Sequence, residues 1–142
     1  MGKQDILNSI NASKSQLQTY EQEKQTLEDK YNTLMDFAGK CSLRATNFNA
    51  SIQSRRRKLN GLNDILGTVK AAARYKNKMN TMLTGAEYKK AVSNINQLQT
   101  VIDSEKNKIL NDLKYVNDQI STCKNKITSL QDDYDNYKEG EQ

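Results

Sequence analysis

The side chains able to do chemistry are few in this chain, and their types argue against catalysis. None of its 142 residues is His, so the commonest general base and the commonest nitrogen ligand for metals are both missing. The carboxylate pairs Asp132–Asp133 and Glu21/Glu23 fall in segments with helical periodicity, where we expect them on solvated faces. Two Cys residues cannot complete a zinc site by themselves. We therefore expect a protein that is not an enzyme and that needs no metal or other cofactor.

The strongest charge feature is the basic run Arg55-Arg56-Arg57-Lys58, in a chain whose formal net charge is +5. Such a run could meet phosphates or an anionic membrane surface. Four consecutive residues of a helix point in different directions, however, and no aromatic residue lies among them to stack on bases. An acidic protein partner or simple solvation is the better interpretation, so neither nucleic acid nor a membrane is the expected partner.

The two cysteines, Cys41 and Cys123, both fall on apolar positions, where Cys packs as a small apolar residue. Cys41 follows Ile6 by 35 residues, and Cys123 follows Tyr88 by the same interval. If the first and third of three helices ran parallel, the two thiols would lie at similar heights. The spacing therefore predicts that they are near neighbours, and a disulfide could form between them after export.

The helices that would position these residues are predicted by a heptad pattern. Hydrophobic residues make up 35% of the chain and charged residues 27%, with no Pro, which suits long helices that each bury a narrow stripe. Apolar residues recur about every 3.5 residues in three segments of one domain, at about 4–38, 43–83 and 85–138. Since short connections make neighbouring helices antiparallel, the expected fold is all-α, an elongated antiparallel up-down-up bundle or coiled coil of two to three long helices.

Two signals predict where these helices end. Gly39 follows strong apolar positions and is a natural helix stop, so Gly39 to Ser42 is the expected first connection. Thr84 and Glu87 form a capping-box pattern, in which the Thr84 hydroxyl would accept the Glu87 amide. The first helix lacks the apolar core of a signal peptide, and no run approaches the roughly 18 apolar residues of a membrane span. The expected location is the cytoplasm.

Polar residues interrupt the apolar stripes, which predicts a chain of marginal stability that gains from a partner. The interrupting residues are Ser13, Lys24, Arg55, Gln99 and Lys106. Five apolar residues of the last helix are candidate contacts for a partner helix, although the core of the chain competes for them. They are Leu113, Val116, Ile120, Ile127 and Leu130. The same stripes could also serve a homo-oligomer.

The tail of the last predicted helix carries Tyr137 and Glu141, a Y-x-x-x-E pattern. Residues four apart on a helix share one face, so the pair is a candidate export signal. The tail, the all-helical pattern and the stretches Cys41–Phe48 and Ala71–Tyr75 make the chain similar to small helical proteins of Gram-positive type VII secretion systems. More narrowly, it resembles the helical accessory proteins of LXG toxins, which extend the WXG hairpin theme.

This resemblance implies a targeting chaperone that binds the helical N-terminal domain of an LXG-type toxin, promotes its type VII secretion and could be co-secreted with it. A second small helical protein could join the complex. The chain departs from the WXG theme in having no Trp-x-Gly, and Leu59-Asn60-Gly61 is an L-x-G of the kind expected by chance. The pattern also suits a coiled-coil escort or stalk protein of a type III or flagellar export apparatus, or a homo-oligomeric coiled-coil scaffold.

Overall fold

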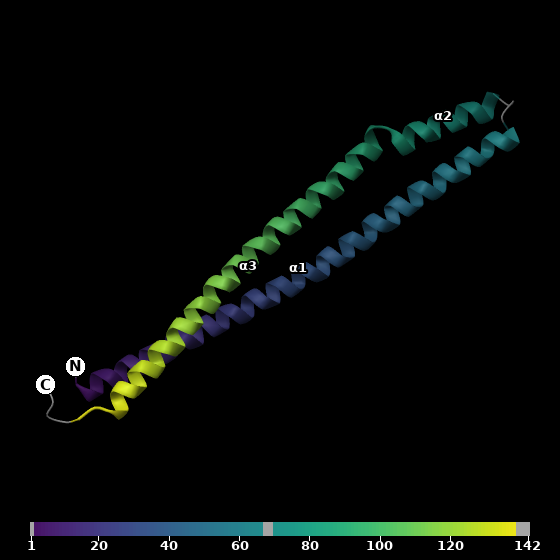
Figure 1. The fold of residues 1–142 in the computed structure, drawn as a ribbon. Helices are drawn as coiled ribbons and strands as arrows, with labels where there is room; N and C mark the ends of the chain where they lie inside the picture. Colours follow the sequence, from purple (N-terminus) through teal and green to yellow (C-terminus); the bar gives the residue numbers. More distant parts are fainter. Residues whose placement is uncertain (1, 67–69, 139–142) are drawn as a thin grey trace. The chain divides into compact units, whose positions relative to one another are not determined.

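In the part of the chain that it describes, the computed structural model has three α-helices (Figure 1). Helix α1 spans Lys3–Leu66, α2 spans Lys70–Thr84 and α3 spans Ala86–Asp135. The structure describes residues 2–66 and 70–138, the side chains of residues 62–66, 71 and 72 excepted. Helices α1 and α3 pack antiparallel as a helical hairpin. The predicted all-α, antiparallel fold is thus confirmed.

Helix α1 continues through the connection predicted at Gly39–Ser42. The predicted helices at about 4–38 and 43–83 therefore share one helix up to Leu66, and the up-down-up order was wrong. Gly39 is exposed, and a Cβ atom added there would meet nothing within 4 Å. A helical Gly costs only about 1 kcal/mol relative to Ala, which the surrounding turns of a 64-residue helix outweigh.

The break after Thr84 exists, but the predicted capping box does not form. The Thr84 hydroxyl donates a 2.6 Å hydrogen bond to the carbonyl of Asn80, one turn back, instead of accepting the amide of Glu87. Thr84 therefore belongs to the end of α2, where the last carbonyls of a helix have no intrahelical amide partner. Because the Thr84 hydroxyl is bonded to the Asn80 carbonyl of α2, it does not cap the N-terminus of α3.

Gly85 separates α2 from α3. The amide of Lys89 donates to the carbonyl of Gly85 at 3.0 Å, which is the first hydrogen bond leading into α3. A Cβ atom on Gly85 would collide with the main-chain carbonyl of Thr81. Only glycine allows the chain to approach the last turn of α2 so closely.

The chain divides into two compact units, each built from segments of more than one helix. The terminal unit comprises residues 1–33 and 105–142, and the central unit comprises residues 34–104. In the terminal unit, the Lys3 ammonium lies 4.6 Å from the centre of the Tyr134 ring, so the start of α1 meets the end of α3. The buried residues of this unit are Ile6, Ile10, Ser13, Val116, Ile120 and Cys123. They form one stripe on each helix, as the heptad pattern predicts.

The core of the central unit joins α1 to the junction of α2 and α3. Ile52 and Leu59 of α1 are buried with Leu83 of α2. Beside them, the rings of Phe48 and Tyr88 stack with centroids 6.1 Å apart and an interplanar angle of 17°. Phe48 of this cluster also lines an apolar groove of the central unit.

Candidate protein-binding groove

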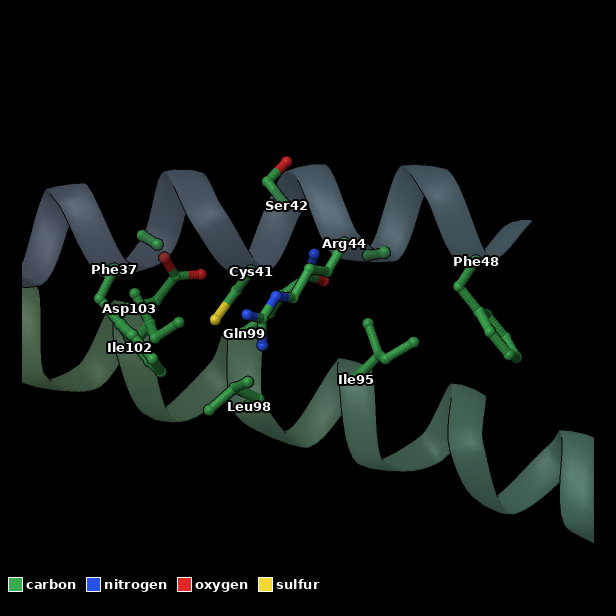
Figure 2. Close-up of a pocket in the computed structure, with 12 residues that line it drawn as sticks. Phe37, Cys41, Ser42, Arg44, Phe48, Ile95, Leu98, Gln99, Ile102 and Asp103 are labelled. Atoms are coloured by element: carbon green, nitrogen blue, oxygen red, sulfur yellow. The ribbon is translucent and has the colours of Figure 1, made fainter. Parts of the chain in front are cut away.

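An apolar groove of about 640 Å³ lies between α1 and α3 in the central unit (Figure 2). Seven residues of α1 and five of α3 line it, and most of them are apolar. They are Phe37, Ala38, Cys41, Ser42, Arg44, Ala45, Phe48, Ile95, Leu98, Gln99, Ile102 and Asp103. In Figure 2 the Cys41 and Phe48 side chains extend from α1 toward α3, whereas Ser42 projects away from α3.

The groove follows from the size of the residues that α1 offers to α3. Ala38, Cys41 and Ala45 are small, and they line the groove between the larger Phe37 and Phe48. Protein interiors normally fill such space at crystal-like density. Here Ile102 is buried, but the lining as a whole leaves about 640 Å³ unfilled. The two helices therefore pack against each other without closing the space between them.

The rim of the groove exposes large apolar side chains to solvent. Phe37 of α1 is 48% exposed and Leu98 of α3 is 39% exposed, and both line the groove. Val101, one turn after Leu98, is 57% exposed but does not line the groove. Six of the eight large, exposed apolar side chains among the described residues belong to the central unit. Of these six, Phe37 and Leu98 line the groove, and large apolar side chains exposed at an open apolar groove are typical of a protein-binding site.

The groove lies in the positively charged part of the chain. Residues 34–104 contain twelve Lys or Arg and four Asp or Glu, which gives a formal charge of +8, whereas the rest of the chain contains ten and thirteen, which gives −3. Among the described residues the only ion pair is between Lys24 and Glu28, 4.0 Å apart in the terminal unit. The positive charge of the central unit is therefore not paired with any carboxylate that the structure describes.

The four residues of the basic run at 55–58 lie in two different environments. Arg55, Arg57 and Lys58 are exposed, whereas Arg56 is half-buried. The Arg56 guanidinium donates a 2.8 Å hydrogen bond to the carbonyl of Leu83 and lies 5.0 Å from the centre of the Tyr88 ring. The prediction that Arg55 lies on the apolar seam was thus wrong by one residue. The spacing of Arg56, four after Ile52 and three before Leu59, is a seam spacing that could have revealed it.

The five predicted partner contacts on α3 lie in the terminal unit, outside the groove. Val116 and Ile120 are 3% and 8% exposed, so they form part of the core of that unit. Leu113, Ile127 and Leu130 are half-buried. The core of the terminal unit therefore takes up Val116 and Ile120, whereas Leu113, Ile127 and Leu130 are only partly covered.

The two cysteines pack in different units. Cys41 is half-buried in the groove of the central unit, Cys123 is buried in the terminal unit, and both are free thiols. The expected proximity depended on parallel first and third helices separated by a break at Gly39. Because α1 has no such break and runs antiparallel to α3, that register was wrong. The equal intervals of 35 residues carry no structural meaning in this hairpin.

The predicted export signal lies beyond the last helix. Helix α3 ends at Asp135, and the Tyr137 amide makes a 3.4 Å hydrogen bond to the Tyr134 carbonyl. Tyr137 therefore does not present its side chain from a helical turn, as the i,i+4 argument assumed. Glu141 lies outside the described residues.

Within residues 2–66 and 70–138, no three His, Cys, Asp or Glu residues gather where a metal ion could be held. No helix in this part of the chain is long and apolar enough to cross a membrane. Comparison of the chain with protein-family models, with curated proteins and with solved structures finds no match.

Proposed function

We propose that the protein is a non-enzymatic binding protein that holds a helix of another protein in the groove of the central unit. The observation that carries this proposal is the pair Phe37 and Leu98, which expose apolar surface from opposite helices of one open groove. Two packed helices bury one stripe each, and a third helix laid between them covers the remaining apolar surface of both. Helix-in-groove binding of this kind uses apolar anchors at helical spacing on the incoming segment.

The partner that we propose is the helical N-terminal domain of an LXG-type toxin, whose type VII secretion the protein would promote. The resemblance to LXG accessory proteins supports this choice, because it suggests a partner made of helices. Binding would cover apolar surface on both proteins before export. The tail around Tyr137 would then be free to act as a signal, since it takes no part in the groove.

Co-expression with an LXG toxin encoded beside this chain tests the proposal. We expect the two proteins to co-purify and the complex to melt at a higher temperature than the free chain, because ligands that bind only the folded state stabilise it. Phe37→Asp combined with Leu98→Asp should abolish co-purification, since it places charge in an apolar interface. Leu110→Asp combined with Tyr115→Asp is the matched control, because Leu110 and Tyr115 are 42% and 60% exposed and lie outside the groove.

Two outcomes would redirect the proposal. If the wild-type chain does not bind the toxin, the assignment to LXG secretion falls. If light scattering shows that the chain alone is an oligomer that the double Asp variant dissociates, the groove serves a second copy, and a homo-oligomeric scaffold is the better account.

A further inference from the structure

We infer that the helix taken by the groove is amphipathic with acidic flanks. This inference rests on the proposed helix-binding function and adds to it the charge class of the partner. It comes from the position of basic residues on α1 relative to the groove, and not from net charge alone.

Four basic residues form a stripe along one side of α1, which passes the groove and continues for about three turns beyond Phe48, the last α1 residue that lines it. They are Lys40, Arg44, Arg55 and Lys58, and each is exposed. Their intervals of 4, 11 and 3 residues are close to whole turns of a helix with 3.6 residues per turn, so they share one side of α1. The same periodicity places this basic stripe at the edge of the α1 face that carries Phe37 and Phe48. Arg44 itself lines the groove.

The basic stripe has few acidic neighbours within the central unit. Along residues 34–61 of α1 the only carboxylate is Asp36, and α3 contributes Asp103 to the groove. None of the four basic side chains makes an ion pair with a carboxylate that the structure describes. An incoming helix with Glu or Asp beside its apolar residues would meet this stripe as it enters the groove. Charges that flank an apolar seam select partners in the same way in coiled coils.

The apolar groove and the basic stripe would play different roles in binding. The apolar groove would supply most of the affinity, because burial of apolar surface is not weakened by salt at moderate concentration. The basic stripe would supply selectivity and a faster association rate, since exposed charges act over about 10 Å at 0.1 M salt and are screened above it. Preference for acidic flanks should therefore be large in dilute buffer and small in concentrated salt.

Three synthetic helical peptides of about three heptads test this inference, each with Leu and Ile at the seam positions. They differ only in the flanking residues, which are Glu, Gln or Lys. Fluorescence anisotropy with the full-length chain should show the Glu peptide binding at least about 10-fold more tightly than the Lys peptide in dilute buffer, with the Gln peptide between them. Raising the salt to about 0.5 M should remove most of this difference.

Charge reversal on the protein supplies the matched comparison. Arg44→Glu with Lys58→Glu should weaken the Glu peptide and strengthen the Lys peptide. Lys114→Glu with Lys126→Glu changes the net charge equally but alters exposed residues of the terminal unit, so it should leave the order of affinities unchanged. If both double variants change the affinities equally, net charge alone is responsible and the basic stripe has no special role.

The Cys41 thiol reports whether a peptide lies in the groove, and this separates the two levels of the proposal. Alkylation of Cys41 should slow when the Glu peptide is bound, while buried Cys123 reacts slowly throughout.

If the Glu and Lys peptides protect Cys41 equally well, the acidic preference is wrong and helix binding stands. If no peptide binds, the helix-binding function falls together with the inference. Tighter binding of a duplex DNA oligonucleotide than of the Glu peptide would assign the basic stripe to nucleic acid instead.

Discussion

The Arg56 guanidinium donates a 2.8 Å hydrogen bond to the main-chain carbonyl of Leu83, 27 residues further along the chain. Leu83 lies in the last turn of α2, where carbonyls lack intrahelical partners and the helix dipole favours a positive charge. The same guanidinium lies over the Tyr88 ring in the first turns of α3. One side chain of α1 thus holds both sides of the break at Gly85.

Replacing Arg56 should therefore destabilise the central unit. We expect Arg56→Ala to lower the free energy of unfolding by about 2 kcal/mol, the usual range for a hydrogen bond from a charged group together with a cation–π contact. Urea denaturation followed by circular dichroism measures this change. Arg57→Ala is the neighbouring control, and because Arg57 is exposed its effect should stay within about 0.5 kcal/mol. Equal effects of the two substitutions would show that the hydrogen bond to Leu83 contributes nothing.

Two glycines should respond in opposite ways to the same substitution. Gly39→Ala should stabilise the chain by up to about 1 kcal/mol, because a Cβ there meets nothing within 4 Å inside a helix. Gly85→Ala should destabilise it, because the new Cβ would collide with the carbonyl of Thr81. Thermal melts of the two variants, compared with wild type, give the signs directly. A loss of stability in Gly39→Ala would mean that the chain bends at Gly39 after all.

Ile120 and Tyr115 separate core from surface on one helix. Ile120 is 8% exposed in the core of the terminal unit, so Ile120→Ala should cost about 2–4 kcal/mol of stability. Tyr115 is 60% exposed, and Tyr115→Ala should change the stability by less than about 0.5 kcal/mol. The comparison requires only chemical denaturation of the isolated chain. If Ile120→Ala lowers the stability by less than about 1 kcal/mol, Ile120 is not part of the core and is again a candidate contact for a partner.

Tyr137 tests the export signal separately from binding. Because α3 ends at Asp135, Tyr137→Ala should leave the helical content by circular dichroism unchanged. Toxin co-purification should also persist, since the groove lies in the central unit. Secretion of the toxin into the medium should fall if the Y-x-x-x-E pattern is read by the secretion system. Normal secretion by the variant would mean that the pattern arose by chance.

Periodicity predicted the parts of this fold that depend on a single helix. The last helix, predicted at about 85–138, is observed as Ala86–Asp135, because its apolar residues keep a 3.5-residue interval for most of its length. The break at Gly39 was wrong because glycine permits a helix end without requiring one. The contacts of Arg56 were not predicted, because the sequence does not show which of three adjacent Arg residues lies beside Leu83 and Tyr88.

The groove could not be predicted, because it depends on how two helices pair. In the sequence, Ala38 and Ala45 are ordinary helix-forming residues. Only the pairing of α1 with α3 shows that they line one groove together with Ile95 and Ile102. The heptad pattern fixes which face of each helix is apolar, but it does not fix the register between the helices. Likewise, the basic stripe can be found by spacing alone, but its place beside a groove cannot.

Helix α2, with 15 residues, is the shortest helix of the chain that the structure describes. A helix of this length is marginal in water by itself, so its persistence depends on Leu83, Met79 and the hydrogen bond from Arg56. Local opening should therefore occur at α2 at a lower free energy than in α1 or α3. In deuterated solvent the amides of α2 would exchange first, and their exchange would accelerate further in the Arg56→Ala variant while the amides around Ile10 and Ile120 kept their protection.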